Sequence, residues 1–149
     1  MARKKPPPRT IAQLVNQASR LFAALGDARL RQLGFRYAQV PVLALLGREE
    51  TLTQAELVRE VGVEQSSMAQ LLKRMEEEGT IERSPHPDHA RKAAVTLSRQ
   101  GAKRVPEARA ALAELDAAAL AGLSAAEVDT LFTLLEKVQA NLRGLGSKG

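Results

Sequence analysis

The chain has 149 residues, a length that suits one domain with extended helical arms and is too short for two separate hydrophobic cores. Hydrophobic residues make up 44% of it and aromatic residues only 3%, which predicts a mainly α-helical protein, and the lack of cysteine excludes disulfides, thiolate metal sites and cysteine redox switches. The net charge of +5 is unevenly spread: six basic side chains and a single acid lie from Arg83 to Arg104, an excess that attracts phosphate, although a solvated basic face would show the same pattern.

Residues 1–9, MARKKPPPR, form a basic, proline-rich N-terminal arm with four positive charges. No apolar run follows this arm, so the pattern is not that of a secretory signal peptide. No stretch of the chain approaches the roughly 18 apolar residues of a membrane-spanning helix. We therefore expect no membrane association and a cytoplasmic location.

Two helices are expected in the first third of the chain. The stretch TIAQ at 10–13 fits a capping box, and apolar residues then recur every three to four positions, which predicts one long helix to about Leu33. Gly34 is expected to end it. A second helix is expected over residues 38–46, ended by Gly47.

Residues 53–79 show the pattern of a helix-turn-helix. The stretch TQAE at 53–56 is a second capping box that opens a short helix, and Gly62 permits a tight turn after it. The helix that follows is capped by Glu64 or Ser66 and carries polar residues on one side and apolar residues on the other. In this arrangement the second helix can enter the major groove of DNA.

A β-hairpin wing is expected after the helix-turn-helix. Two strand-like segments, Ile81–Arg83 and Ala93–Leu97, flank the loop SPHPDHARK. Short polar side chains at the start of the second helix can reach base edges, and Arg91 and Lys92 in the wing can neutralise phosphates. The predicted DNA-binding residues are Gln65, Ser66, Ser67, Gln70, Lys73, Arg74, Arg91 and Lys92. The plainer interpretation of the helix residues is an exposed face without DNA contacts.

The acidic run at 76–78, at the end of the second helix, is interpreted as a solvated helix end. Its negative charge should keep that end away from phosphate, so we expect the N-terminal end of the helix to face DNA.

Two further helices are expected in the C-terminal third. One follows Ser98, with a kink near Pro106, and the other begins with a capping box at Ser124 and carries an apolar stripe from Val128 to Leu142. A stripe this wide would leave much apolar area exposed in a monomer. We therefore expect a homodimer, whose two recognition helices lie about one DNA turn apart and bind a palindrome-like operator.

The stretch from Leu52 to Gly101 resembles the winged-helix core of the MarR family of bacterial transcriptional regulators. The residues that carry the resemblance are Leu52-Thr53-Gln54, Glu56-Leu57, Gly62-Val63, Leu71-Leu72, Glu78-Gly79, Arg83, Leu97-Ser98 and Gly101. The long flanking helices extend it loosely over almost the whole chain. It implies one MarR-like domain over 10–149, with a winged helix-turn-helix lobe at 38–101 and dimerisation helices at 10–34 and 102–145.

The chain departs from the family pattern at two places. The wing tip reads His89-Ala90-Arg91 where the family usually has Asp-Arg-Arg or Asp-x-Arg, so Arg91 lacks the aspartate that would help to hold it. The recognition helix has Gln70 where arginine is frequent. Because Gln pairs bidentately with adenine and Arg with guanine, the preferred operator is expected to differ.

The resemblance also implies a small-molecule pocket between the dimer interface and the DNA-binding lobe. The candidate effector-binding residues are Phe22, Phe35, Arg36 and Tyr37, near the junction of the first two helices. An anionic aromatic compound could pair with the arginine. The same residues would also serve as interface core with a solvated rim.

We interpret the chain as a sequence-specific, double-stranded DNA-binding transcriptional regulator, a repressor released by a small-molecule effector. No catalytic constellation is present, so no enzyme activity and no cofactor are expected. His86, Asp88 and His89 are interpreted as a solvated loop rather than a metal site. The remaining alternative is a winged-helix protein-interaction module that does not bind DNA.

Overall fold

The computed structural model describes residues 9–49 and 51–146. The chain divides into two compact units, Met1–Leu115 and Asp116–Gly149. The predicted basic arm, apart from Arg9, lies outside the described residues. One domain over residues 10–149, with its predicted lobe and dimerisation helices, stays a prediction.

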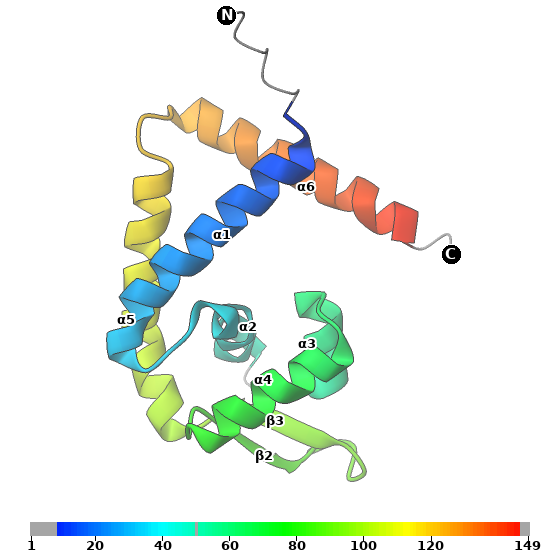
Figure 1. Cartoon of the computed structure of the whole chain (residues 1–149). Coiled ribbons are helices and arrows are strands. Elements are labelled where there is room, and N and C mark those ends of the chain that lie inside the picture. Colours follow the sequence, from blue (N-terminus) through cyan, green and yellow to red (C-terminus); the bar gives the residue numbers. More distant parts are fainter. Residues whose placement is uncertain (1–8, 50, 147–149) are drawn as a thin grey trace, which may run out of the picture. The chain divides into compact units, whose positions relative to one another are not determined.

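The described part of the chain is mostly helical with one small antiparallel sheet, which confirms the predicted fold class (Figure 1). Short 3₁₀ turns at Arg31–Leu33 (η1) and Tyr37–Gln39 (η2) connect the first two helices. The elements are α1 (Ile11–Leu30), α2 (Val40–Glu49), β1 (Thr51–Thr53), α3 (Gln54–Val61), α4 (Gln65–Glu77), β2 (Ile81–Pro85), β3 (Ala93–Leu97), α5 (Arg99–Ala119) and α6 (Ala125–Gly146).

The three predicted capping boxes are confirmed. The Thr10 hydroxyl accepts from the Gln13 amide at 3.2 Å, the Thr53 hydroxyl from the Glu56 amide at 3.3 Å, and the Ser124 hydroxyl from the Glu127 amide at 3.2 Å. In each box the side chain of the fourth residue accepts from the backbone amide of the first. Reciprocal bonds of this kind satisfy amides that a helix end otherwise leaves unpaired. The pKa of the Glu56 carboxyl is lowered, because the Thr53 amide and the Thr53 hydroxyl both donate to its Oε2, at 2.7 Å and 3.0 Å, and favour the ionised form.

Glycines were predicted to end several helices, and the structure confirms some of these ends but not all. Gly34 and Gly62 adopt left-handed conformations, with φ of 76° and 74°, and Gly62 ends α3 as predicted. The first helix was expected to reach about Leu33, but α1 ends at Leu30, and Gly34 ends the 3₁₀ turn η1 that follows it. Gly47 was expected to end α2, but the helix continues through it to Glu49. Gly47 faces Val105 and Arg109 of α5, and this tertiary packing outweighs its low helix propensity.

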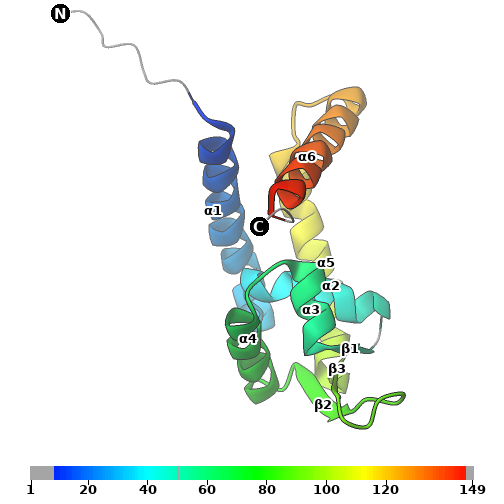
Figure 2. The ribbon, with the colours of Figure 1, turned by 90° about the vertical axis from the view of Figure 1, so that its right-hand side faces the viewer.

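The sheet has three strands in the order β1-β3-β2, all antiparallel. The predicted hairpin is confirmed as β2 and β3, with β2 running two residues beyond its predicted end to Pro85. The short strand β1 was not predicted; it pairs Leu52 with Val95. Figure 1 and Figure 2 show the hairpin near α4, with its loop directed away from the helices.

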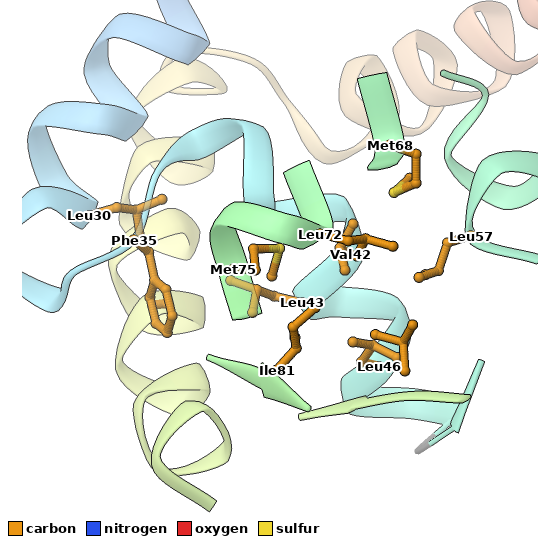
Figure 3. Close-up of a cluster of buried hydrophobic side chains, with 12 residues drawn as sticks. Leu30, Phe35, Val42, Leu43, Leu46, Leu57, Met68, Leu72, Met75 and Ile81 are labelled. Atoms are coloured by element: carbon orange, nitrogen blue, oxygen red, sulfur yellow. The ribbon is translucent and has the colours of Figure 1, made fainter. Parts of the chain in front are cut away.

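The hydrophobic core of the first unit lies where α2, α3 and α4 meet the sheet (Figure 3). Met68, Leu72 and Met75 fill it from α4 and are completely buried. Burial of a side chain of this size contributes about 1.5–3 kcal/mol. The other members of the cluster are Leu30, Phe35, Val42, Leu43, Leu46, Leu57, Ile81, Val95 and Ala108.

The end of α4 is tied to the start of α5 by four residues, Gly79, Thr80, Ser98 and Gly101, which we call the α4–α5 joint. The Ser98 hydroxyl donates to the Gly79 carbonyl at 2.5 Å and accepts from the Gly101 amide at 2.9 Å, and the Ser98 amide donates to the Thr80 carbonyl at 2.9 Å. Gly101 is buried, and a Cβ there would collide with the carbonyl oxygen of Thr80. The joint therefore depends on the absence of a side chain at this position.

We expect Gly101→Ala to lower the free energy of unfolding by about 1–3 kcal/mol, because the colliding neighbour is backbone that cannot rotate away. Chemical denaturation monitored by circular dichroism measures this loss. Gly144→Ala is the matched control, since a Cβ at this helical position has no neighbour within 4 Å and should raise helix stability slightly. Equal stability of the Gly101→Ala protein and the wild type would contradict the prediction.

Candidate nucleic-acid interface

The N-terminal part of α4 presents a continuous polar face. Gly62 turns the chain, and Glu64 is the N-cap residue, with extended backbone and no side-chain capping bond. Of the two predicted caps Glu64 is therefore right, and Ser66 lies inside the helix. The residues predicted on this helix to bind DNA are all exposed: Gln65, Ser66, Ser67, Gln70, Lys73 and Arg74. Since the opposite side of α4 is buried in the core, this face must point to solvent.

The wing supplies the basic part of the candidate interface. Arg91 and Lys92 are exposed, and the loop is closed at its base by the His86 amide, which donates to the Lys92 carbonyl at 2.8 Å. A shallow groove of about 350 Å³ lies between the two strand ends. Its lining includes Arg83, whose charge is paired with Glu76, and the two cationic wing residues Arg91 and Lys92. Such a groove attracts phosphate oxygens.

Two histidines lie close together in the wing loop. The rings of His86 and His89 have centroids 5.3 Å apart, and the Asp88 amide donates to His86 Nδ1 at 3.1 Å. Within residues 9–49 and 51–146, no group of three or more His, Asp or Glu side chains is placed to hold a metal ion. The bond to Nδ1 orders the loop locally.

The acidic end of α4 is exposed, as expected from the sequence, and two of its three carboxylates also have partners within the protein. Arg83 Nε of β2 lies 3.1 Å from Glu76 Oε2, and the Gln39 amide group donates to Glu78 Oε2 at 2.8 Å. Gln39 is completely buried, so Glu78 is held from the core side. Only the middle carboxylate, Glu77, is without such a bond to the described part of the chain. Gln39 is distant in sequence and Arg83 lies on a strand, so the run at 76–78 did not by itself reveal these partners.

A cavity of about 430 Å³ lies beside the C-terminal end of α4. It is lined by Asp27, Arg31, Gly34, Phe35, Arg36 and Glu78. Phe35 and Arg36, two of the four predicted effector-binding residues, are thus brought together. Phe22 and Tyr37 do not line it; the Tyr37 ring packs on Gly26, and the Tyr37 amide donates to Asp27 Oδ1 at 2.7 Å. Sequence reasoning missed three charged wall residues, Asp27 of α1, Arg31 of η1 and Glu78 directly after α4, because only the fold assembles them.

None of the helices in the described residues is both long and apolar enough to cross a membrane.

The chain matches known proteins of one family. The model of the MarR family matches residues 33–92, which span α2, the helix-turn-helix and most of the wing. The chain is 31% identical to a probable transcriptional regulator from Pseudomonas aeruginosa, with a TM-score of 0.78, and the match covers 87% of this chain and 96% of that one.

Solved structures similar to this chain include complexes with DNA. A mutant of MarR from E. coli complexed with operator DNA is 27% identical, with a TM-score of 0.79, and the match covers 86% of this chain and 92% of that one. A putative MarR family regulator from Listeria monocytogenes, complexed with a 26mer DNA, shares the fold at 18% identity, with a TM-score of 0.83 and coverage of 91% and 90%. The predicted resemblance is confirmed: the chain belongs to the MarR family of winged helix-turn-helix transcriptional regulators.

Proposed function

We propose that this DNA-binding transcriptional regulator recognises its operator with α4 in the major groove and the wing against the adjacent backbone or minor groove. The observation that carries the proposal is the division of α4 into a fully buried apolar side and an exposed polar side next to a basic wing. A protein-interaction module without DNA binding is not favoured, since the relative from E. coli was solved on its operator. A regulator of this kind acts on DNA, so we place it in the cytoplasm and assign it no enzymatic activity.

We assign two kinds of contact within this interface. Gln65, Ser66, Ser67 and Gln70 are polar and uncharged, and we assign them to base edges. The cationic side chains contact phosphates and fix the register of the protein without reading sequence. These phosphate-binding residues are Lys73, Arg74, Arg91 and Lys92.

The protein acts as a homodimer in this proposal. Leu21 of α1 is 63% exposed and Leu142 of α6 is 62% exposed, and both helices carry further exposed apolar side chains. Apolar rows of this extent are unfavourable in water and mark an interface. A twofold dimer presents two α4 helices to two half-sites, which is the geometry that a palindrome-like operator requires.

The cavity beside α4 is the proposed effector site. Phe35 provides an aromatic wall, and the guanidinium groups of Arg36 and Arg31 provide positive charge for a small anionic aromatic compound. Glu78, which lines the same cavity, is the residue that follows α4 and accepts from the buried Gln39. A ligand at this place touches the end of the recognition helix, which supports the proposal of a repressor released by an effector.

The proposed roles of Arg91 and Gln70 differ in how their loss depends on DNA sequence. Arg91→Ala should weaken binding to every duplex and reduce the salt slope of log K by about one unit. Gln70→Ala should cost about 1–3 kcal/mol on a selected operator and much less on random DNA. Titrating each variant with the operator and with random DNA at two salt concentrations measures these affinities and their salt slopes. An equally small effect of Gln70→Ala on the two duplexes would limit base reading to Gln65, Ser66 and Ser67.

Dimerisation predicts a solution mass twice that of the 16.1 kDa chain. Sedimentation equilibrium at micromolar concentration measures it. Leu21→Glu together with Leu142→Glu should shift the protein toward monomer, because each change places a charge in the proposed apolar interface. Arg59→Glu, on an exposed site of α3, is the control for a change of surface charge. A wild-type monomer would remove the basis for a palindromic operator.

The effector proposal predicts that benzoate, as a probe, binds at millimolar concentration and that neutral benzamide does not. Arg31→Ala or Arg36→Ala should weaken benzoate binding on the order of tenfold, since each removes a charge-assisted hydrogen bond. Isothermal titration calorimetry measures the affinity. Arg29→Ala removes the same charge from the last turn of α1 without touching the cavity, and should leave the affinity unchanged. Equal losses in all three variants would point to general electrostatics instead of a site.

A further inference from the structure

The recognition helix and the wing are connected by an ion pair that the DNA-binding assignments do not use. Glu76 lies in the last turn of α4, and Arg83 lies in the middle of β2, with Arg83 Nε 3.1 Å from Glu76 Oε2. Among the described residues this is the one ion pair that links a helix to the sheet. The two side chains are only partly exposed, at 29% for Arg83 and 47% for Glu76.

The side of the sheet on which Arg83 lies follows from the alternation of side chains along β2. Ile81 is buried, and side chains two residues apart on a strand share a face, so Arg83 leaves the sheet on the same side as Ile81. It stands opposite Val95 of β3, which is also buried. From this side of the sheet its guanidinium reaches Glu76 in the last turn of α4.

The wing needs a second attachment because β2 is an edge strand. It pairs with β3 on one side only, and beyond Pro85 the chain enters the wing loop. On its other side β2 is tied to α4 through the turn at Gly79 and Thr80 and through buried Ile81. The ion pair at Arg83 lies two residues farther toward the wing tip, so it resists a swing of the hairpin about that turn.

We propose that Glu76 and Arg83 are positioning residues of the DNA interface, which hold the wing at the distance from α4 that lets both elements contact one DNA site. The inference rests on the proposed DNA-binding function. Two linked contacts strengthen each other only when the link holds both at the spacing of their targets. Without the ion pair the wing keeps its positive charge, but its position relative to α4 is less restrained. Arg91 and Lys92 then cannot contact their phosphates at the same time as Gln70 contacts its base.

The direction in which Glu76→Gln changes DNA affinity distinguishes a positioning role from a simple effect of charge. Glu76→Gln removes one negative charge from the protein, so electrostatics alone predict tighter binding to every duplex. Positioning predicts the opposite on an operator selected with the wild-type protein: a loss of about three- to tenfold. Glu77→Gln is the matched control, since it makes the same change one residue later, where the side chain has no bond to the described part of the chain. It should bind slightly tighter on all duplexes.

Two further variants test the link itself. The charge-swapped protein, Glu76→Arg with Arg83→Glu, has the wild-type net charge and should recover most of the affinity that Arg83→Glu alone loses. In the Glu76→Gln background, Arg91→Ala should lose less affinity than it does in the wild type, because a misplaced wing makes a weaker phosphate contact. Melting temperatures should stay close to the wild type throughout, since a partly exposed ion pair contributes little to stability.

The outcomes distinguish failure of the positioning role from failure of the proposed DNA-binding function. If Glu76→Gln tightens binding as Glu77→Gln does, or if the effects of Glu76→Gln and Arg91→Ala simply add, the positioning role is overturned while DNA binding stands. If the wild-type protein binds no duplex, the proposed function falls and the positioning role falls with it.

Discussion

The burial of one side of α4 is the constraint on which the DNA-facing part of the molecule depends. Met68, Leu72 and Met75 recur at three- and four-residue spacing and are completely withdrawn from water against α2, α3 and the sheet. Because a helix is a rigid rod, this anchoring also determines where its other side points. The uncharged polar residues from Gln65 to Gln70 are consequently displayed on a face that cannot rotate inward without exposing the core.

The electrostatics of the interface follow from this anchoring. The basic residues of the wing and the acidic end of α4 lie on neighbouring elements, and the acids are largely restrained within the protein. Glu78 is held by buried Gln39, and Glu76 is paired with Arg83. Restrained carboxylates repel phosphate less than free ones when a cation stands beside them, since the pair has no net charge. The excess of positive charge is then left at the wing loop.

The sequence predicted this architecture best at features that are determined by interactions between neighbouring residues. The boxes at Thr10, Thr53 and Ser124 close through contacts within four residues, and Gly62 adopts a conformation that glycine favours, so each could be identified without the fold. Local rules failed at Gly47, where packing against α5 keeps a glycine helical, and at β1, whose three residues are too short to show a strand pattern and exist as a strand only through β3.

The same distinction holds for the candidate sites. The sequence by itself determined that the chain forms a winged helix-turn-helix and which residues of its second helix are polar, because periodicity and turn chemistry are encoded over a few neighbouring positions. Only the tertiary structure decided that Phe35 and Arg36 share a cavity with Glu78 while Phe22 and Tyr37 do not, and that Arg83 pairs with Glu76 instead of standing free beside Arg91. Those relations join residues that are far apart along the chain or lie on different elements. They are set by how helices and strands pack on a common core, and no local pattern records that packing.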